Sequence, residues 1–296
     1  MRKKIFEIIV IGTSLLLVGC GSRGEVKRDA SGKQVLSGYI TLSGAFALYP
    51  LAIQWADEFH RLHPDVDIDI SAGGAGKGIT DVLADQVDIA MVSRELKPQE
   101  KEKGALAYAV AKDAVVATIN ANNPVYRKLL QAGLSQKQAT AIWEGKTKMN
   151  VYTRSDACGA AETWAAFLGK KQEDLKGTGV FGDPGVAETL QKDVNGIGFN
   201  NIGYAYNDKT HKPTKGIAIV PIDVNGNGKL DAEEKFYDTL DELMDAIAKG
   251  KYPAPPARNL YLVTAGKPKN PVVVEFLKYV RTKGQRLNAP AGFVHI

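Results

Sequence analysis

Apolar and polar positions follow alternating strand-like and helix-like patterns from residue 35 onward. Strands are predicted at residues 35–42, 66–70 and 87–92, and helices at residues 51–62 and 79–83. Apolar residues recur every three or four positions in the helical segments, whereas they alternate with aspartates in the second strand. Strand, turn and helix in repeated succession predict a largely parallel sheet with helices on its faces. Such sheets bind ligands at the carboxyl ends of their strands, where the loops of this segment fall.

A second lobe is predicted to follow, because the pattern is interrupted and later returns. A strand at residues 114–119 ends in the loop 120–124, whose asparagines and proline indicate a crossing between lobes. The strand at residues 260–263 would carry the chain back, and two crossings form a hinge around a cleft. We therefore expect a two-lobed α/β fold, each lobe a mixed, mostly parallel sheet flanked by helices, joined by a two-strand hinge. The expected bounds are 35–118 plus 258–296 for lobe I and 119–257 for lobe II.

The N-terminal segment has the pattern of an export signal. Three basic residues precede an apolar run at residues 5–18, which is too short to span a membrane comfortably. The tetrapeptide Leu-Val-Gly-Cys at 17–20 resembles the lipobox of bacterial lipoproteins. The resemblance implies a signal peptide at 1–19 and a mature chain that begins at a diacylated Cys20. The polar segment 20–34 would be a flexible tether to the outer face of the cytoplasmic membrane or within the periplasm, with the outer membrane as a further alternative.

Charge and cysteine content exclude some classes of protein. Removal of residues 1–19 from the 296-residue chain would lower its net charge from +5 to +3, because three basic residues and one acidic residue are lost. A charge this small gives no argument for nucleic-acid binding. The chain has two cysteines, so a lipidated Cys20 would leave Cys158 without a disulfide partner.

The segment 151–164 combines a strand, a charged turn and the start of a helix. Arg154 and Asp156 enter a turn of small residues, and a helical pattern begins at Ala160. The first N–H groups of a helix have no partner inside the helix and lie at its positive end. Together with the guanidinium of Arg154, they predict a site for an anion. The alternative is an ordinary Arg154–Asp156 ion pair that braces the turn.

Four loops together resemble those of the phosphate-binding proteins of ABC importers. They are residues 43–46, 73–78, 92–96 and 154–160, and residues 196–199 also look like a segment of that family. The similarity covers most of residues 37–296. It implies a periplasmic-binding-protein fold that holds phosphate or a related oxyanion between two lobes and delivers it to the permease subunits of an ABC importer. It further implies a monomer that is not an enzyme, requires no cofactor and binds no nucleic acid.

The family's motifs, placed on this chain, give a set of candidate ligand contacts. Positive charge would come from Lys77, Arg94 and Arg154. Asp156 is a candidate acceptor for a proton of the ligand, unless Arg154 neutralises it. The full set is Ala45, Phe46, Ala75, Gly76, Lys77, Gly78, Ser93, Arg94, Arg154, Asp156, Cys158, Gly159 and Ala160.

Four of these positions depart from the family pattern. The family usually has hydroxyl residues where this chain has Phe46, Ala75, Cys158 and Ala160. Backbone N–H groups survive all four replacements, so an oxyanion remains the expected ligand. Phosphate is favoured, and sulfate or another tetrahedral anion stays open.

Two rival interpretations concern the glycine loop and Cys158. The loop at 73–78 lacks the Ser or Thr that a P-loop places after its Lys, so that motif is rejected. A thiol-dependent enzyme would use Cys158, whose pKa a helix N-terminus can lower, but no histidine lies in a loop expected to approach it. This enzyme is the disfavoured alternative, whereas an oxyanion sensor or an adhesion-type module on the same fold stays open.

A separate motif at residues 223–234 matches the twelve-residue calcium loop at positions 1, 3, 5, 6, 9 and 12. A strand is expected before it, so it would be a solitary loop with a structural Ca²⁺. The alternative is an acidic Asn-Gly turn. The expected ligands are the side chains of Asp223, Asn225, Asn227, Asp231 and Glu234 and the carbonyl of Lys229.

Overall fold

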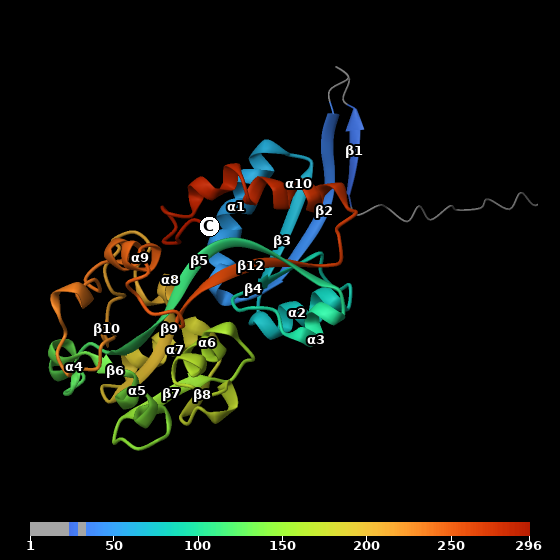
Figure 1. The fold of residues 1–296 in the computed structure, drawn as a ribbon. Coiled ribbons are helices and arrows are strands. Elements are labelled where there is room, and N and C mark those ends of the chain that lie inside the picture. The colour runs from blue at the N-terminus through green and yellow to red at the C-terminus, as the bar shows by residue number, and fades with distance from the viewer. Residues whose placement is uncertain (1–23, 29–33) are drawn as a thin grey trace, which may run out of the picture.

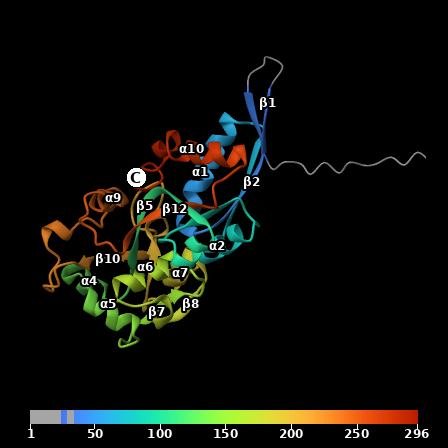
Figure 2. The same ribbon diagram turned by 45° about the vertical axis from the view of Figure 1, so that its right-hand side comes forward.

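Two lobes of sheet and helix are joined by two long strands (Figures 1 and 2). The structure, a computed structural model, describes residues 24–28 and 34–296. The strands of the main sheet are β1 (Gly24–Arg28), β2 (Gln34–Gly44), β3 (Val66–Ala72), β4 (Ile89–Val92), β5 (Ala105–Asn120), β7 (Asn150–Arg154), β8 (Thr178–Val180), β9 (Gly196–Asn201), β10 (Ile217–Val220) and β12 (Ala257–Ala265). Their order is β1-β2-β4-β12-β5-β9-β7-β8, with β3 paired to β2 and β10 to β5. The predicted two-lobed α/β fold is confirmed.

Lobe I is built on the parallel strands β2, β3 and β4, and β12 lies antiparallel beside β4. Its longest helix has Pro50 in the first turn and buries Leu51, Trp55 and Phe59, as the helical spacing predicts. The ring of Phe59 packs edge-on against Phe276 of the last α-helix at 5.2 Å, which ties the two ends of the lobe together. The helical segments are η1 (Phe46–Leu48), α1 (Tyr49–Leu62), α2 (Ala75–Leu83), α3 (Pro98–Glu102), α10 (Pro271–Val280) and η4 (Lys283–Leu287).

Lobe II pairs β7 in parallel with both β8 and β9, while β5 runs antiparallel to β9 and β10. Trp143 and Trp164 pack edge-to-face at 5.1 Å, and Phe199 stacks on Trp164 at 5.9 Å. These rings form the centre of the lobe II core. The helical segments are α4 (Tyr126–Ala132), α5 (Gln136–Trp143), α6 (Gly159–Phe167), η2 (Gln172–Asp174), α7 (Gly182–Lys192), α8 (Ile202–Ala205), η3 (Ala232–Glu234) and α9 (Leu240–Ala248), and β6 (Leu134–Ser135) pairs with β11 (Ile222–Asp223).

The hinge consists of β5 and β12, which run antiparallel between the lobes. Along β5 the buried apolar side chains up to Ala111 belong to the lobe I core, and those from Ala114 onward belong to the lobe II core. The crossing therefore lies before the expected boundary at residue 118 and not in the loop 120–124. The reason is that β5 continues unbroken across both lobes, and the asparagines that follow it only form a turn, in which the Asn120 side chain accepts the N–H of Asn122 at 2.8 Å.

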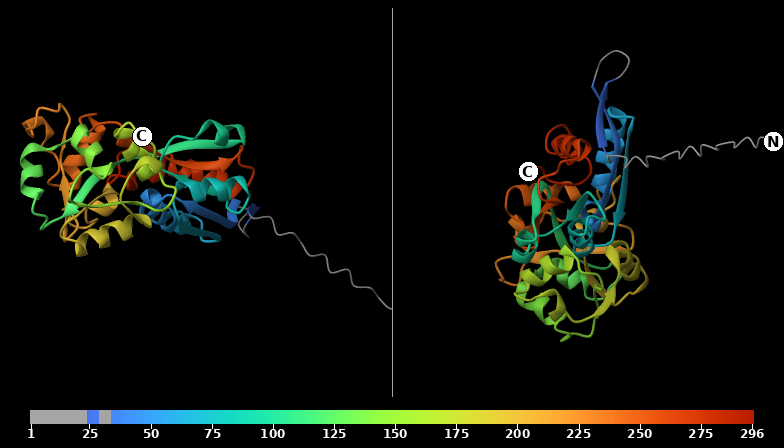
Figure 3. Two further views of the ribbon diagram at one scale, coloured as in Figure 1. Left: turned by 90° about the horizontal axis from the view of Figure 1, so that it is seen from below. Right: turned by 90° about the vertical axis from the view of Figure 1, so that its right-hand side faces the viewer.

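The segment expected to be a flexible tether contains a strand. β1 pairs antiparallel with β2, from Gly24 opposite Gly38 to Arg28 opposite Gln34. Its small and charged side chains gave no strand signal, because an edge strand forms through backbone hydrogen bonds and leaves most side chains in solvent. This hairpin lies at the end of lobe I that is farthest from lobe II (Figures 1 and 3).

The predicted signal peptide and lipidation site, Cys20 included, lie outside the described residues. Within residues 24–28 and 34–296, no helix has the length and apolar character needed to cross a membrane.

Candidate functional site

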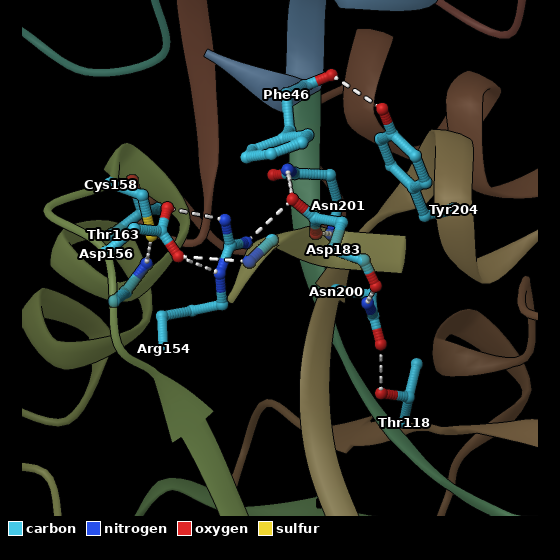
Figure 4. A network of polar contacts seen from close by, with 12 residues as sticks. Phe46, Thr118, Arg154, Asp156, Cys158, Thr163, Asp183, Asn200, Asn201 and Tyr204 are labelled. Atoms are coloured by element: carbon cyan, nitrogen blue, oxygen red, sulfur yellow. Dashed lines mark hydrogen bonds and ion pairs between the residues drawn. The ribbon is translucent and has the colours of Figure 1, made fainter. Parts of the chain in front are cut away.

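The loops expected to form the site meet where the two lobes touch. The N–H of Gly76, in the first turn of α2, donates a hydrogen bond of 3.0 Å to the carbonyl oxygen of Ala157 in lobe II. Gly159, the first residue of α6, lies so close to Ser93 that a Cβ atom on it would stand 2.4 Å from the Ser93 Oγ. Phe46 reaches the same place from the loop after β2 (Figure 4). The structure thus brings one loop of lobe II together with three loops of lobe I.

Arg154 is the buried cation of this interface. Its Nε and Nη2 donate to the two oxygens of Asp156 at 2.8 and 2.7 Å, and its Nη1 donates to Oδ2 of Asp183 at 2.7 Å. Burial alone would lower the pKa of Arg154, but the nearby carboxylates outweigh it and raise that pKa above its ordinary value. One guanidinium therefore stands between two carboxylates, and the cluster has a net negative charge.

Asp183 is a residue of this cluster that the sequence reasoning missed. It is fully buried, and it also accepts the backbone N–H of Asn201 at 2.8 Å and the Asn201 side-chain amide at 2.7 Å. A signal was available, because Asp183 stands in the first turn of α7 directly after β8, in the same strand–turn–helix arrangement as the other loops. The Asp156 carboxylate also accepts the N–H of Gly182 at 3.1 Å, so both acids are held in place from α7.

Two helices from opposite lobes point their N-termini at this interface. α2 begins after Gly74, which has a positive φ of 91° and gives no side-chain cap. In α6 the Cys158 sulfur accepts the N–H of Ala161 at 3.5 Å. Within the described part of the chain, no hydrogen bond takes up the N–H of Gly159 or Ala160. Unpaired N–H groups at the positive ends of helices are suited to an anion.

Comparison with known proteins gives this arrangement a family. Residues 29–283 match the family described as a PBP superfamily domain. The chain belongs to this family. This chain is 25% identical over 227 residues to the phosphate-binding protein PstS of Bacillus subtilis, and the alignment covers 70% of this chain and 73% of the relative. It is 27% identical to the phosphate-binding protein PstS of Pseudomonas aeruginosa, with 88% of this chain and 83% of the relative covered.

Solved structures agree on the fold of the PBP-superfamily chain. A phosphate ABC transporter substrate-binding protein of Clostridium perfringens, determined with bound phosphate, superposes with a TM-score of 0.71 at 21% identity. That comparison covers 88% of this chain and 100% of the other. The resemblance noted in the sequence is confirmed.

Lys77 does not reach the interface between the lobes. Its ammonium pairs with Asp81 one turn along α2, and its side chain is half exposed. The Asp81 carboxylate also accepts the Ser43 hydroxyl at 2.6 Å. The positive charge expected from Lys77 is therefore used inside lobe I.

Arg94 is also held by protein carboxylates. Its guanidinium binds Glu100 through two hydrogen bonds, of 2.8 and 2.7 Å. The Nε atom lies 3.0 Å from Oε2 of Glu162 in α6, close enough for an ion pair but without hydrogen-bond geometry. Lys97 donates to the same Glu162 carboxylate at 3.0 Å. Arg94 and Lys97 of lobe I thus hold Glu162 of lobe II across the interface.

The small residues of lobe I act through their backbones. The N–H of Ala45 donates to the carbonyl oxygen of Met91 at 2.8 Å. Gly78 lies so close to β2 that a Cβ atom would stand 2.7 Å from the Ser43 carbonyl oxygen. Ala75 is completely buried at the start of α2. The absence of a side chain at Gly78 thus lets α2 approach the end of β2.

Cys158 is part of the turn but not a reactive thiol. The residue is 4% exposed, and burial raises the pKa of its thiol to about 12, although Arg154 acts in the opposite direction. The thiolate is the nucleophilic form of cysteine, so this thiol is inert near neutral pH. Its sulfur serves as the N-cap of α6 in the role that a Ser hydroxyl often takes.

In the predicted calcium loop the carboxylates accept hydrogen bonds from backbone N–H groups of the loop itself. The Asp223 carboxylate accepts the N–H groups of Gly226 and Gly228 at 2.8 and 2.9 Å, and Glu234 accepts the N–H of Val224 at 2.8 Å. The side-chain amides of Asn225 and Asn227 donate to the Asp231 carboxylate at 3.0 and 2.8 Å, whereas Lys229 is exposed. Across residues 24–28 and 34–296, no three His, Cys, Asp or Glu side chains are grouped so as to hold a metal ion.

Proposed function

We propose that this chain is an extracytoplasmic, lipid-anchored solute-binding protein that captures phosphate or a similar tetrahedral oxyanion between its lobes for an ABC importer. The observation that carries the proposal is that α2 and α6 meet from opposite lobes, and that α6 has unpaired N–H groups in its first turn beside buried Arg154. Backbone N–H groups at helix N-termini bind oxyanions without any side-chain hydroxyl. The relatives named phosphate-binding protein support phosphate as the ligand.

The charge of the site favours an anion that carries a proton. Asp156 and Asp183 already outnumber Arg154, so a fully deprotonated dianion such as sulfate meets a buried negative cluster. Hydrogen phosphate can donate its proton to a carboxylate, and arsenate can do the same. A buried acceptor left unpaired rejects a ligand that has no proton to donate.

Isothermal titration of the full-length protein in detergent tests this function. We expect saturable binding of phosphate and arsenate, with sulfate and molybdate weaker by at least about tenfold. Absence of binding to all four anions at millimolar concentration would remove the proposed function.

We also propose that the chain is held at the membrane through a diacylated Cys20 and acts as a monomer. Gly24, where β1 begins, stands four residues after Cys20, a stretch that spans at most about 14 Å when fully extended. Lobe I would then be the lobe that stays close to the membrane. Replacement of Cys20 by Ala should release the protein from the membrane fraction, and the released protein should elute as a monomer.

A structural Ca²⁺ in the loop 223–234 is a separate proposal, supported by the donor set alone. Three carboxylates and two amide oxygens suit a hard cation, but Asp223 and Glu234 would have to exchange backbone partners for the ion. We expect millimolar Ca²⁺ to raise the melting temperature by a few degrees, as ligand binding to the native state does. The Asp231→Asn variant should lose this response, and an unchanged melting temperature in the wild-type protein contradicts the site.

A further inference from the structure

The ring of Phe46 covers Arg154 from the opposite lobe. The guanidinium carbon of Arg154 lies 5.5 Å from the centroid of the Phe46 ring, and the ring stands over the cluster in Figure 4. Phe181 packs edge-on against the same ring at 5.6 Å. Gly182 leaves the space for it, because a Cβ atom there would stand 3.0 Å from the ring. A side chain of lobe I is thus inserted among lobe II residues.

Three of the five N–H groups of the Arg154 guanidinium are taken up by carboxylates. Asp156 occupies Nε and Nη2, and Asp183 occupies Nη1. The Arg154 side chain is only 1% exposed, with the Phe46 ring over it. The second N–H of Nη1 and of Nη2 has no carboxylate partner in the described part of the chain. Because the side chain is so deeply buried, an oxyanion can reach these two groups only if the ring or a carboxylate moves aside.

The ring is the weaker of these two partners. Loss of a cation–π contact typically changes an equilibrium by about tenfold. Loss of one partner from a buried ion pair typically changes it by more than a hundredfold, because a buried charge is left uncompensated. The ring is accordingly the group that leaves when an anion arrives.

We propose that Phe46 is an affinity-determining residue whose ring competes with the oxyanion for Arg154, so that loading of the cleft requires the ring to swing away. This inference rests on the proposed function. The backbone at Phe46 can stay in place while the ring moves. The Tyr204 hydroxyl donates a hydrogen bond of 3.1 Å to the Phe46 carbonyl oxygen, and this bond does not involve the Phe46 side chain. The competition lowers the affinity for every tetrahedral anion. The loss is offset only for ligands that also donate a proton to Asp156 or Asp183.

Three variants of the full-length protein in detergent test the competition, with phosphate as the titrant. Phe46→Ala should bind phosphate on the order of tenfold more tightly than the wild type, since the ring is gone and no new donor is added. Phe46→Leu should fall between the two proteins. Phe181→Ala is the matched control: Phe181 touches the same ring but is 60% exposed, and its affinity change should stay within about twofold.

The outcomes separate this inference from the function on which it rests. If the wild type binds phosphate and Phe46→Ala binds it equally or more weakly, the competition is wrong and the proposed function stands. If neither protein binds any of phosphate, arsenate or sulfate at millimolar concentration, both are wrong. Thermal unfolding without ligand shows whether Phe46→Ala is folded, and if it is not, an affinity of Phe46→Leu no higher than that of the wild type overturns the inference.

Discussion

The two sides of the interlobe site use charge in different ways. In lobe II the side chain of Arg154 is 1% exposed and held by two buried carboxylates, Asp156 and Asp183. In lobe I the side chain of Lys77 is half exposed, and its ammonium pairs with Asp81. An ion pair in solvent contributes little to stability, whereas the removal of one partner from a buried pair is costly. Around Arg154 the fixed charges therefore come from lobe II, whereas lobe I contributes the Phe46 ring there and a second buried cation, Arg94, at the contact with Glu162.

Arg154→Ala tests this difference with the largest expected effect. The free energy of unfolding should fall by about 3–5 kcal/mol, because two buried carboxylates lose their counter-charge. Phosphate affinity should fall as well, by about 2–5 kcal/mol. Urea unfolding and isothermal titration measure the two quantities.

Lys77→Ala is the matched control in lobe I, where the same kind of change removes a cation from one carboxylate. Its effect on the free energy of unfolding should stay below about 1 kcal/mol, with phosphate affinity nearly unchanged. Equal effects of the two substitutions would contradict the division of roles between the lobes.

Asp183→Asn keeps the shape of the lobe II cluster but removes one negative charge. The loss of a buried charge partner for Arg154 should lower the free energy of unfolding by about 1–3 kcal/mol. Selectivity should move toward sulfate, with the phosphate-to-sulfate affinity ratio falling by about tenfold, because the cluster becomes electrically neutral.

The Asp-to-Asn substitution at Asp81, in lobe I, is the control for Asp183→Asn. Asp81→Asn should leave the phosphate-to-sulfate ratio as it is, since Asp81 faces Lys77 and Ser43 and not the cluster. A ratio that stays constant in Asp183→Asn would show that Asp183 has no part in selectivity.

The sequence predicted the meeting of the loops but not what fills the space between them. Strand ends and small residues identify the loops, because a close approach of backbones needs residues such as Gly76 and Gly159. Asp183 could not be paired with Arg154 in the same way, since 29 positions separate them and only the parallel pairing of β7 with β8 brings them together. The sequence also could not show where the side chains of Lys77 and Arg94 lie. Their charges are paired with the nearby acids Asp81 and Glu100, which were not considered when the two cations were assigned to the ligand.

The crossing between lobes was misplaced for a related reason. Asparagines and a proline mark a turn wherever they stand, whereas a hinge inside a continuous strand such as β5 leaves no mark in composition. For β1 the composition was misleading in another way. Its charged residues gave no strand signal, yet the segment forms a strand because the edge of β2 is free to pair with it.

Glu162→Gln tests the contact that spans the two lobes, with a smaller expected effect. Arg94 and Lys97 of lobe I both reach this carboxylate from across the interface. Its side chain is 25% exposed, so the charge should contribute about 0.5–1 kcal/mol to the closed arrangement. We expect a larger radius of gyration for the ligand-free variant by small-angle X-ray scattering.

Glu144→Gln provides the control, because Glu144 pairs with Lys146 and Lys170 inside lobe II. The radius of gyration of this variant should match that of the wild type. An identical radius for Glu162→Gln would show that the bridge does not hold the lobes together.

Cys158 is the position where we expect the smallest effect at neutral pH. Cys158→Ser should change the free energy of unfolding by less than about 1 kcal/mol, because a hydroxyl can also accept the N–H of Ala161. Burial raises the pKa of the thiol from its usual 9.0 to about 12, so the folded state favours the neutral form. This contribution to stability is complete below about pH 9, where the unfolded thiol is also neutral, and is lost as the pH rises toward about 12.

Labelling with iodoacetamide measures the same property directly. At pH 9 about half of an ordinary thiol is ionised. The raised pKa keeps the buried Cys158 thiol largely neutral at that pH, so alkylation of the folded protein should be much slower than that of free cysteine. Cys158→Ser reports any background from other sites. Rapid alkylation at neutral pH would mean a thiolate beside Arg154, and lobe II would then hold a reactive group where the structure places only a helix cap.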